Sequence, residues 1–147
     1  MKLLSTFLIV VFLLSDTTSA QEKKNPLAGT TWKMVSAEYS WGDSTLIHPT
    51  SKFHKGISMW GKTYSLATWQ DTSKQSTFYV GHMYTIEDDE VIFKIAFWPD
   101  PRFIGRTFEL KYEITENELI FSGIIPEKKW GLGDHDMKVH EVWKRID

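Results

Sequence analysis

The sequence predicts an all-β protein that folds as an eight-stranded, up-and-down antiparallel barrel. Eight β-rich runs follow one another, short turns join most of them, and no window after residue 20 shows a helical period of 3.6. Several runs alternate apolar and polar residues with a period of two, which is typical of a sheet with one dry and one wet side. Closing such a meander into a barrel removes both sheet edges. An open two-sheet sandwich is the alternative.

Turn residues set the bounds of the runs. Gly61 and Lys62 are expected to join the second and third strands as a hairpin. Residues 87–89 form an acidic turn, and Pro99 and Pro101 end the fifth strand because proline fixes φ and lacks a donor. The expected strands are 30–39, 52–60, 63–69, 78–86, 90–98, 104–114, 118–125 and 137–146.

The long segment 40–51 is predicted to be an irregular loop between the first two strands. Connections of this length without secondary structure are uncommon and are often functional. We expect this one to fold over an open end of the barrel as a lid.

The first twenty residues are predicted to be a secretory signal peptide. Lys2 provides a positive start, residues 3–14 are mostly apolar, and the small residues 18–20 precede a cut before Gln21. Residues 21–26 are expected to form a loose arm, and residues 27–147 the barrel domain. The apolar run is too short for a membrane anchor, so no membrane association is expected once the leader is removed.

Composition excludes several classes of protein. The absence of cysteine rules out disulfides and thiolate metal sites. The formal charge of −2, with acidic and basic residues interspersed, provides no basic stripe for nucleic acid. An exported protein, periplasmic or secreted, fits these features, and the oligomeric state stays open.

Both ends of the domain resemble the lipocalin-like (calycin) proteins, in particular small exported bacterial ones that are mostly uncharacterised. Residues 27–36 are similar to their opening strand and residues 141–146 to their last strand. Residues 84–89 and 103–105 are also similar to that group. The resemblance implies that Trp32, Arg145 and Trp143 close one end of the barrel, where a guanidinium lies over an indole.

The barrel interior is the first candidate for a binding site. In the fifth strand Val91, Phe93, Ile95 and Phe97 are expected on one face, opposite Lys94. We expect a small, largely apolar molecule to bind inside, since such pockets combine aromatic walls with a few polar groups. A filled core is the alternative interpretation. The candidate ligand-binding residues are His82, Tyr84, Phe93, Phe97, Phe108, Tyr112 and Glu141, of which His82 or Glu141 would orient the ligand.

Two other functions use different residues. Asp134, His135 and Asp136 could hold zinc or act as an acid and base in a hydrolase or isomerase. Trp41, Trp98 and Trp130 precede turn residues and could stack on sugars in a carbohydrate-binding or structural module. No cofactor and no metal are expected, and the isolated histidines lack a haem attachment motif.

Overall fold

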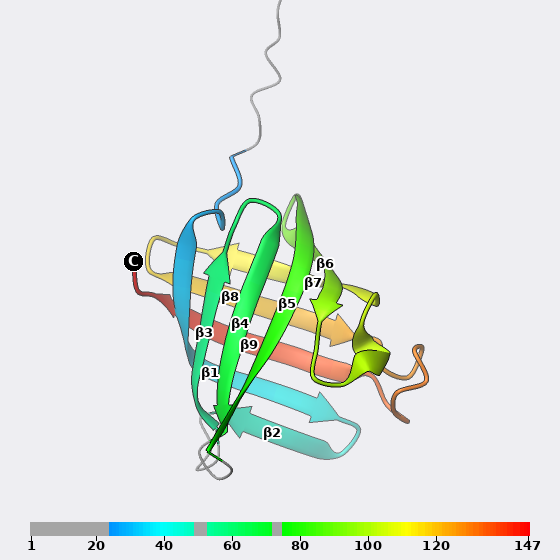
Figure 1. Cartoon of the computed structure of the whole chain (residues 1–147). Coiled ribbons are helices and arrows are strands. Elements are labelled where there is room, and N and C mark those ends of the chain that lie inside the picture. Colours follow the sequence, from blue (N-terminus) through cyan, green and yellow to red (C-terminus); the bar gives the residue numbers. More distant parts are fainter. Residues whose placement is uncertain (1–23, 49–52, 72–74) are drawn as a thin grey trace, which may run out of the picture.

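The computed structural model describes residues 24–48, 53–71 and 75–147, so the predicted leader lies outside the described residues. One antiparallel sheet of nine strands makes up this part of the chain (Figure 1). No helix within it is long and apolar enough to cross a membrane. The elements are β1 (Thr30–Trp41), β2 (Ser44–His48), β3 (Phe53–Trp60), β4 (Tyr64–Asp71), β5 (Ser76–Glu87), β6 (Glu90–Phe97), the 3₁₀ helix η1 (Pro101–Phe103), β7 (Thr107–Ile114), β8 (Glu118–Ile125) and β9 (Met137–Arg145).

Pairing of the first and last strands closes the sheet into a barrel. From β3 to β9 each strand pairs with the next, and β1 pairs with both β3 and β9. Eight strands therefore form the closed wall, as the alternating sequence predicted, and the open sandwich is excluded. The hairpin expected around Gly61 is present, with Trp60 opposite Ser65.

The sheet contains one strand more than predicted, β2, and this strand shows that the prediction of an irregular loop over residues 40–51 was wrong where the structure describes it. These residues were expected to form an irregular lid, but β1 continues to Trp41 and turns at Gly42 and Asp43 into β2, with Trp41 opposite Ser44. Residues 49–51 of the predicted lid lie outside the described residues. Gly42 has a φ of 56°, the left-handed conformation that a two-residue hairpin turn requires. The Gly-Asp pair was a hairpin signal that the sequence interpretation missed.

A β-bulge in β1 reverses which side chains face inward. Met34 pairs with Trp143 and Ala37 pairs with Glu141, so β1 uses three steps where β9 uses two. Even-numbered residues such as Trp32 point inward before the bulge, and odd-numbered residues such as Tyr39 point inward after it. Bulges re-aim side chains in this way because the extra residue breaks the period of two.

A second bulge corrects the placement of Phe97. The adjacent residues Gly81 and His82 on β5 oppose Phe97 and Ile95 on β6, which leaves Ala96 as an extra residue. The alternation that buries Phe93 and Ile95 therefore fails beyond Ile95, and Phe97 is 52% exposed on the outside of the barrel. The alternation of apolar and polar residues in the sequence does not show where an extra residue interrupts the pairing of two strands.

One end of the barrel is closed by packed side chains. Trp32 is fully buried, Arg145 lies over its ring at 5.8 Å, and the indole Nε1 donates to Thr30 Oγ1 at 2.6 Å. Asn25, part of the predicted loose arm, accepts from the backbone N–H of Leu27 at 3.0 Å and donates to Tyr84 Oη at 2.8 Å. The described end of the arm is thus fixed to the closed end.

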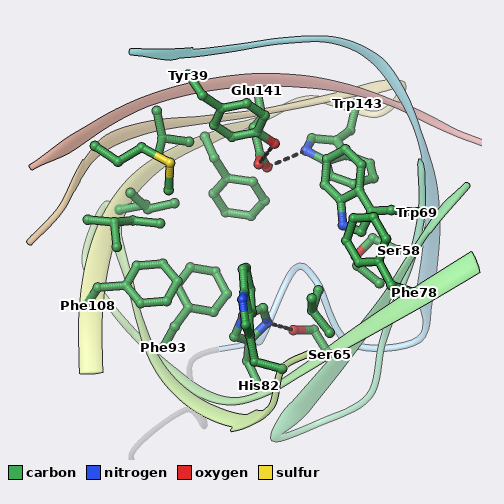
Figure 2. Close-up of a pocket in the computed structure, with 18 of the residues that line it drawn as sticks. Tyr39, Ser58, Ser65, Trp69, Phe78, His82, Phe93, Phe108, Glu141 and Trp143 are labelled. Carbon is green, nitrogen blue, oxygen red and sulfur yellow. Dashed lines mark hydrogen bonds between the residues drawn. The ribbon is translucent and has the colours of Figure 1, made fainter. Parts of the chain in front are cut away.

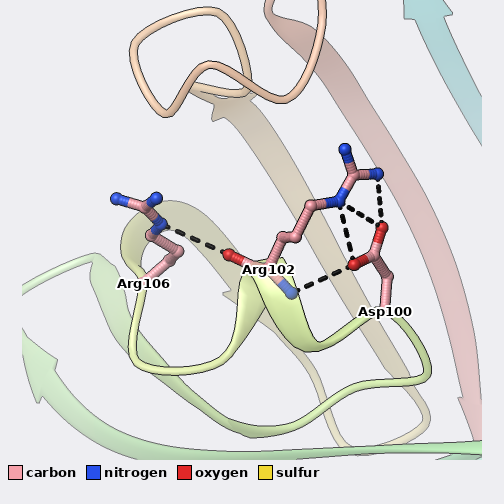
Figure 3. A network of polar contacts seen from close by, with 3 residues as sticks. All are labelled: Asp100, Arg102 and Arg106. Carbon is pink, nitrogen blue, oxygen red and sulfur yellow. Dashed lines mark hydrogen bonds and ion pairs between the residues drawn. The ribbon is translucent and has the colours of Figure 1, made fainter.

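The opposite end carries the longer connections. Figure 1 places η1 and the loop after β8 together at the right, away from the C terminus. Asp100 caps η1 by accepting from the Arg102 backbone N–H at 3.0 Å, and its carboxylate also holds the Arg102 guanidinium (Figure 3). Arg106 Nη2 reaches Trp130 O at 3.5 Å, so the β6–β7 connection contacts the β8–β9 loop.

Candidate functional site

The barrel interior holds a cavity of about 310 Å³ between the filled closed end and the end with the longer loops. The interior is therefore partly core and partly hollow. Three small inward-facing residues on neighbouring strands, Ser58, Ser65 and Ala67, leave this space. The lining consists of Tyr39, Trp41, Leu46, Ser58, Trp60, Ser65, Ala67, Trp69, Phe78, Val80, His82, Phe93, Trp98, Phe108, Leu110, Phe121, Ile125, Met137, Val139, Glu141 and Trp143.

Trp60 provides the rigid base of this cavity. Its ring stacks on Phe121 with a centroid separation of 5.6 Å and contacts Tyr84 edge-on at 4.9 Å. Phe93 touches the same indole at 5.9 Å and stacks on Phe108 at 5.0 Å. These contacts join the cavity wall to the packed core, so the cavity is preformed.

Glu141 is the acidic group of the cavity, and two donors hold its carboxyl in place. Tyr39 Oη donates to Oε1 at 2.6 Å, and Trp143 Nε1 donates to Oε2 at 3.0 Å (Figure 2). Trp143 shares a face with Glu141 because the two are separated by one residue on β9, and the bulge in β1 brings Tyr39 inward. Burial raises the pKa of Glu141 above its usual range, although both hydrogen bonds act in the opposite direction.

His82 lies across the cavity from Glu141 in Figure 2. Its Nδ1 is 3.4 Å from Ser65 Oγ, and its Nε2 is buried without a hydrogen-bond partner in the described structure. Phe93 and Phe108 contact the imidazole ring edge-on at 5.2 and 5.9 Å. This apolar burial lowers the pKa of His82 from 6.5 to about 4, so the ring is neutral at pH 7.

Because His82 resists protonation in the folded state, stability should fall as the solution is acidified. The unfolded chain takes up a proton below pH 6.5 and the folded chain only near pH 4. The free energy of unfolding should therefore fall between these values, by about 3 kcal/mol at ~1.4 kcal/mol per pKa unit. Denaturant unfolding at a series of pH values from 7 to 4 measures this decrease in the free energy of unfolding.

Two histidine variants distinguish the contribution of His82 to this pH dependence from the contributions of the other titrating groups. His82→Gln should flatten this part of the pH profile, while His135→Gln, at an exposed position, should keep the wild-type slope. Glu141 is present in the wild type and in both variants, so its contribution cancels when the pH profile of a variant is subtracted from that of the wild type. An unchanged slope in His82→Gln would refute the assignment.

Comparison with solved structures identifies the architecture. A lipocalin-like protein from Bacteroides uniformis superposes with a TM-score of 0.50 and 11% identity, covering 82% of this chain and 98% of that one. The chain has a lipocalin-like fold. An uncharacterized protein from Bacteroides eggerthii matches with a TM-score of 0.48 and 15% identity, covering 82% and 99% of the two chains. The sequence matches no family model and no curated protein.

Four of the predicted ligand-binding residues meet at the cavity of this lipocalin-like barrel, namely His82, Phe93, Phe108 and Glu141. Tyr84 points inward but lies at the closed end, where its hydroxyl donates to Gly61 O at 2.6 Å. Tyr112 is half-buried away from the cavity, with its hydroxyl 3.4 Å from Asp88 O. Phe97 lies on the outside of the barrel and does not line the cavity.

The residues expected to close the lipocalin-like barrel divide into two groups. Trp32 and Arg145 stack at the closed end, with Arg145 Cζ 5.8 Å from the centre of the Trp32 ring. Trp143 instead lines the cavity and binds Glu141. The period of two along β9 could have revealed this, since residues 141 and 143 share a face.

Tyr39 and Trp69 are cavity residues that sequence reasoning missed. Tyr39 faces inward only because of the bulge in β1, and the sequence contains no clear signal for that bulge. Trp69 and Ala67 are two residues apart on β4 and therefore share a face. We predicted this strand from its sequence but did not assign which of its side chains point inward.

The proposed metal or acid–base group is not assembled in this structure. Asp134, His135 and Asp136 are exposed, and Asp136 Oδ1 accepts from the backbone N–H of Lys128 at 3.0 Å. Within the described ranges no three histidine or acidic side chains lie close enough to hold a metal ion. Asp136 instead links the two ends of the β8–β9 loop through this hydrogen bond.

The three loop tryptophans pack against the barrel. Trp98 stacks on Phe103 at 5.3 Å, and Trp130 contacts Phe108 edge-on at 6.4 Å. Trp41 donates from Nε1 to Glu127 Oε2 at 3.1 Å, which links the β1–β2 hairpin to the β8–β9 loop. Trp41 and Trp98 thereby line the cavity, and none of the three forms an exposed platform for a sugar ring.

Proposed function

We propose that this lipocalin-like barrel binds a small, largely apolar molecule non-covalently inside its cavity. The preformed cavity of about 310 Å³, lined mainly by aromatic and aliphatic side chains, carries the proposal. Pockets for small molecules have this composition, with few polar groups that fix the orientation of the ligand. Glu141, His82 and Tyr39 are the titratable groups that line the cavity.

The cavity volume limits the size of the ligand. An engineered apolar cavity of roughly 150 Å³ in another protein holds one benzene molecule. The cavity here has about twice that volume, so a ligand with two fused rings, or an aliphatic chain of similar bulk, fits.

Apolar contact alone gives only weak binding. Burying roughly 300 Å² of apolar ligand surface contributes about 7 kcal/mol, while lost translational and rotational freedom costs about 4 kcal/mol or more. The difference corresponds to a dissociation constant near the millimolar range, at about 1.4 kcal/mol per factor of ten. Selective binding therefore needs a polar contact, which Glu141 is placed to make.

Titration with a neutral two-ring compound tests the proposal. We expect 2-(1-naphthyl)ethanol to bind with one-to-one stoichiometry and to change the intrinsic fluorescence, because five of the lining residues are tryptophans. Isothermal calorimetry on the same protein measures the dissociation constant, which is expected to lie between about 0.1 and 10 mM. Sucrose serves as the polar control and should produce no signal. Absence of any saturable response to the naphthyl compound would refute the proposal.

We also propose that the protein works outside the cytoplasm. The leader-like residues 1–20 and the absence of cysteine support this. Expression of the full chain in a Gram-negative host should yield an exported protein whose intact mass begins at Gln21. An uncleaved cytoplasmic product would contradict it.

A further inference from the structure

We propose that the ligand is an organic cation, an apolar ammonium ion whose charge pairs with Glu141 inside the cavity. This inference rests on the proposed function and names the chemical class of the ligand. It follows from three features around the carboxyl group: the charge of the cavity, the hydrogen bonds of Glu141 and the aromatic rings beside it.

The cavity contains an acidic group but no basic side chain in its lining; the basic neighbour of Glu141, His140, is exposed outside the cavity and lowers the pKa of Glu141 only as the smallest of the effects on it. Among the residues that line the cavity there is no lysine or arginine, and His82 is neutral at pH 7. The ion pairs described in this structure join Arg102 to Asp100, Lys111 to Asp89 and Arg145 to Asp147, all away from Glu141. Buried carboxylates are ordinarily paired, since an isolated buried charge is costly. A cationic ligand would supply the missing charge.

The hydrogen bonds at Glu141 favour an acceptor role toward the ligand. Each carboxyl oxygen accepts one bond, from Tyr39 and from Trp143, and an indole N–H can only donate. A carboxylate has about four acceptor positions, so both oxygens keep capacity for a further donor. An ammonium group with its N–H donors fits that capacity, whereas a carboxylate ligand would be repelled. Burial also raises the pKa of Glu141, and a nearby cation would lower it again.

Aromatic rings next to the carboxyl suit the rest of a cation. Trp69 lies beside Trp143 on the cavity wall (Figure 2), with its ring centroid 6.1 Å from that of Trp143 and 6.4 Å from that of Tyr39 and with steep angles between the planes. Phe78 stacks on Trp69 at 6.3 Å and extends the wall. Aromatic rings set at steep angles to one another also form the walls of aromatic cages, which attract an ammonium group within about 6 Å.

Three compounds with the same naphthyl group and different charge test the inference. We expect the cation 2-(1-naphthyl)ethylamine to bind wild-type protein about 10- to 100-fold more tightly than neutral 2-(1-naphthyl)ethanol, the range of a hydrogen bond to a charged group. The anion 1-naphthylacetate should bind more weakly than either. Calorimetry at pH 7 measures all three without any substitution.

Two variants locate the effect. Glu141→Gln should remove the preference for the amine, so that this variant binds amine and alcohol about equally, because glutamine keeps the shape and loses the charge. Glu113→Gln removes the same charge from an exposed position on β7 and should leave the preference intact. Circular dichroism checks that both variants fold.

The outcomes separate the two proposals. Equal binding of amine and alcohol, or a preference that survives in Glu141→Gln, would overturn the cation assignment and leave a neutral ligand for the cavity. If none of the three compounds binds, the proposed function fails and the inference with it. Tighter binding of 1-naphthylacetate would exclude a cationic ligand directly.

Discussion

Replacing Ala67 with phenylalanine is expected to reduce naphthyl-ligand binding by more than about 100-fold while the barrel stays folded. Ala67 is 8% exposed, points into the cavity and pairs with Ser58 on β3 and Val80 on β5. A benzyl group at this position would occupy the space that the ligand needs. Because the cavity already exists, the added ring fills a void and should change the free energy of unfolding by less than about 1 kcal/mol, or increase it. Calorimetry and urea unfolding measure the two effects.

The matched control uses the neighbouring residue on the same strand. Leu66 is 40% exposed on the outside of the barrel. Leu66→Phe adds an aromatic ring there without reaching the cavity, so binding should remain within about twofold of wild type. If Ala67→Phe binds ligand as well as this control does, the ligand site lies elsewhere.

Replacing Trp32 with alanine should destabilise the protein by about 3–5 kcal/mol, a large part of the stability of a domain of this size. Trp32 is completely buried, it supports the Arg145 guanidinium, and its indole nitrogen binds Thr30. Alanine removes these contacts and leaves a void at the closed end, where the neighbouring strands are fixed by pairing on both sides. Urea unfolding at pH 7 gives the free energy.

An exposed aromatic residue gives the comparison for Trp32. Tyr64 is 63% exposed at the start of β4, and Tyr64→Ala should change stability by no more than about 0.5 kcal/mol. Trp32→Phe should lose less than Trp32→Ala because a large ring remains in place. A loss below about 1 kcal/mol for Trp32→Ala would show that the closed end does not depend on this residue.

Much of the fold could be predicted because alternation is a local property of the sequence. The apolar residues Phe93 and Ile95, separated by one polar residue, identify an inward face without any knowledge of their neighbours. Turn chemistry at Gly61 and at the acidic residues 87–89 fixes hairpins in the same local way. Alternation placed Phe93 and Phe108 on the inward faces of their strands, and both line the cavity.

The errors at Phe97, at Tyr39 and in residues 40–48 involve a residue inserted into one strand or a strand paired outside the meander. Ala96 moves Phe97 out of the barrel, and the bulge near Val35 brings Tyr39 in. β2 and β3 pair with the same edge of β1. β3 pairs with its first residues, near the closed end, and β2 pairs with its last residues. Each of these depends on how two strands align, and the sequence of one strand does not contain that alignment.

By itself, the sequence determined an all-β meander with one apolar face, because side-chain direction in a strand follows from spacing alone. Only the tertiary structure decided that this face encloses a space. That space exists because Ser58, Ser65 and Ala67, small residues on adjacent strands, lie among larger aromatic residues across the closed barrel. The position of Glu141 between Tyr39 and Trp143 has the same origin, since strands from the two ends of the chain must pair before these three side chains meet.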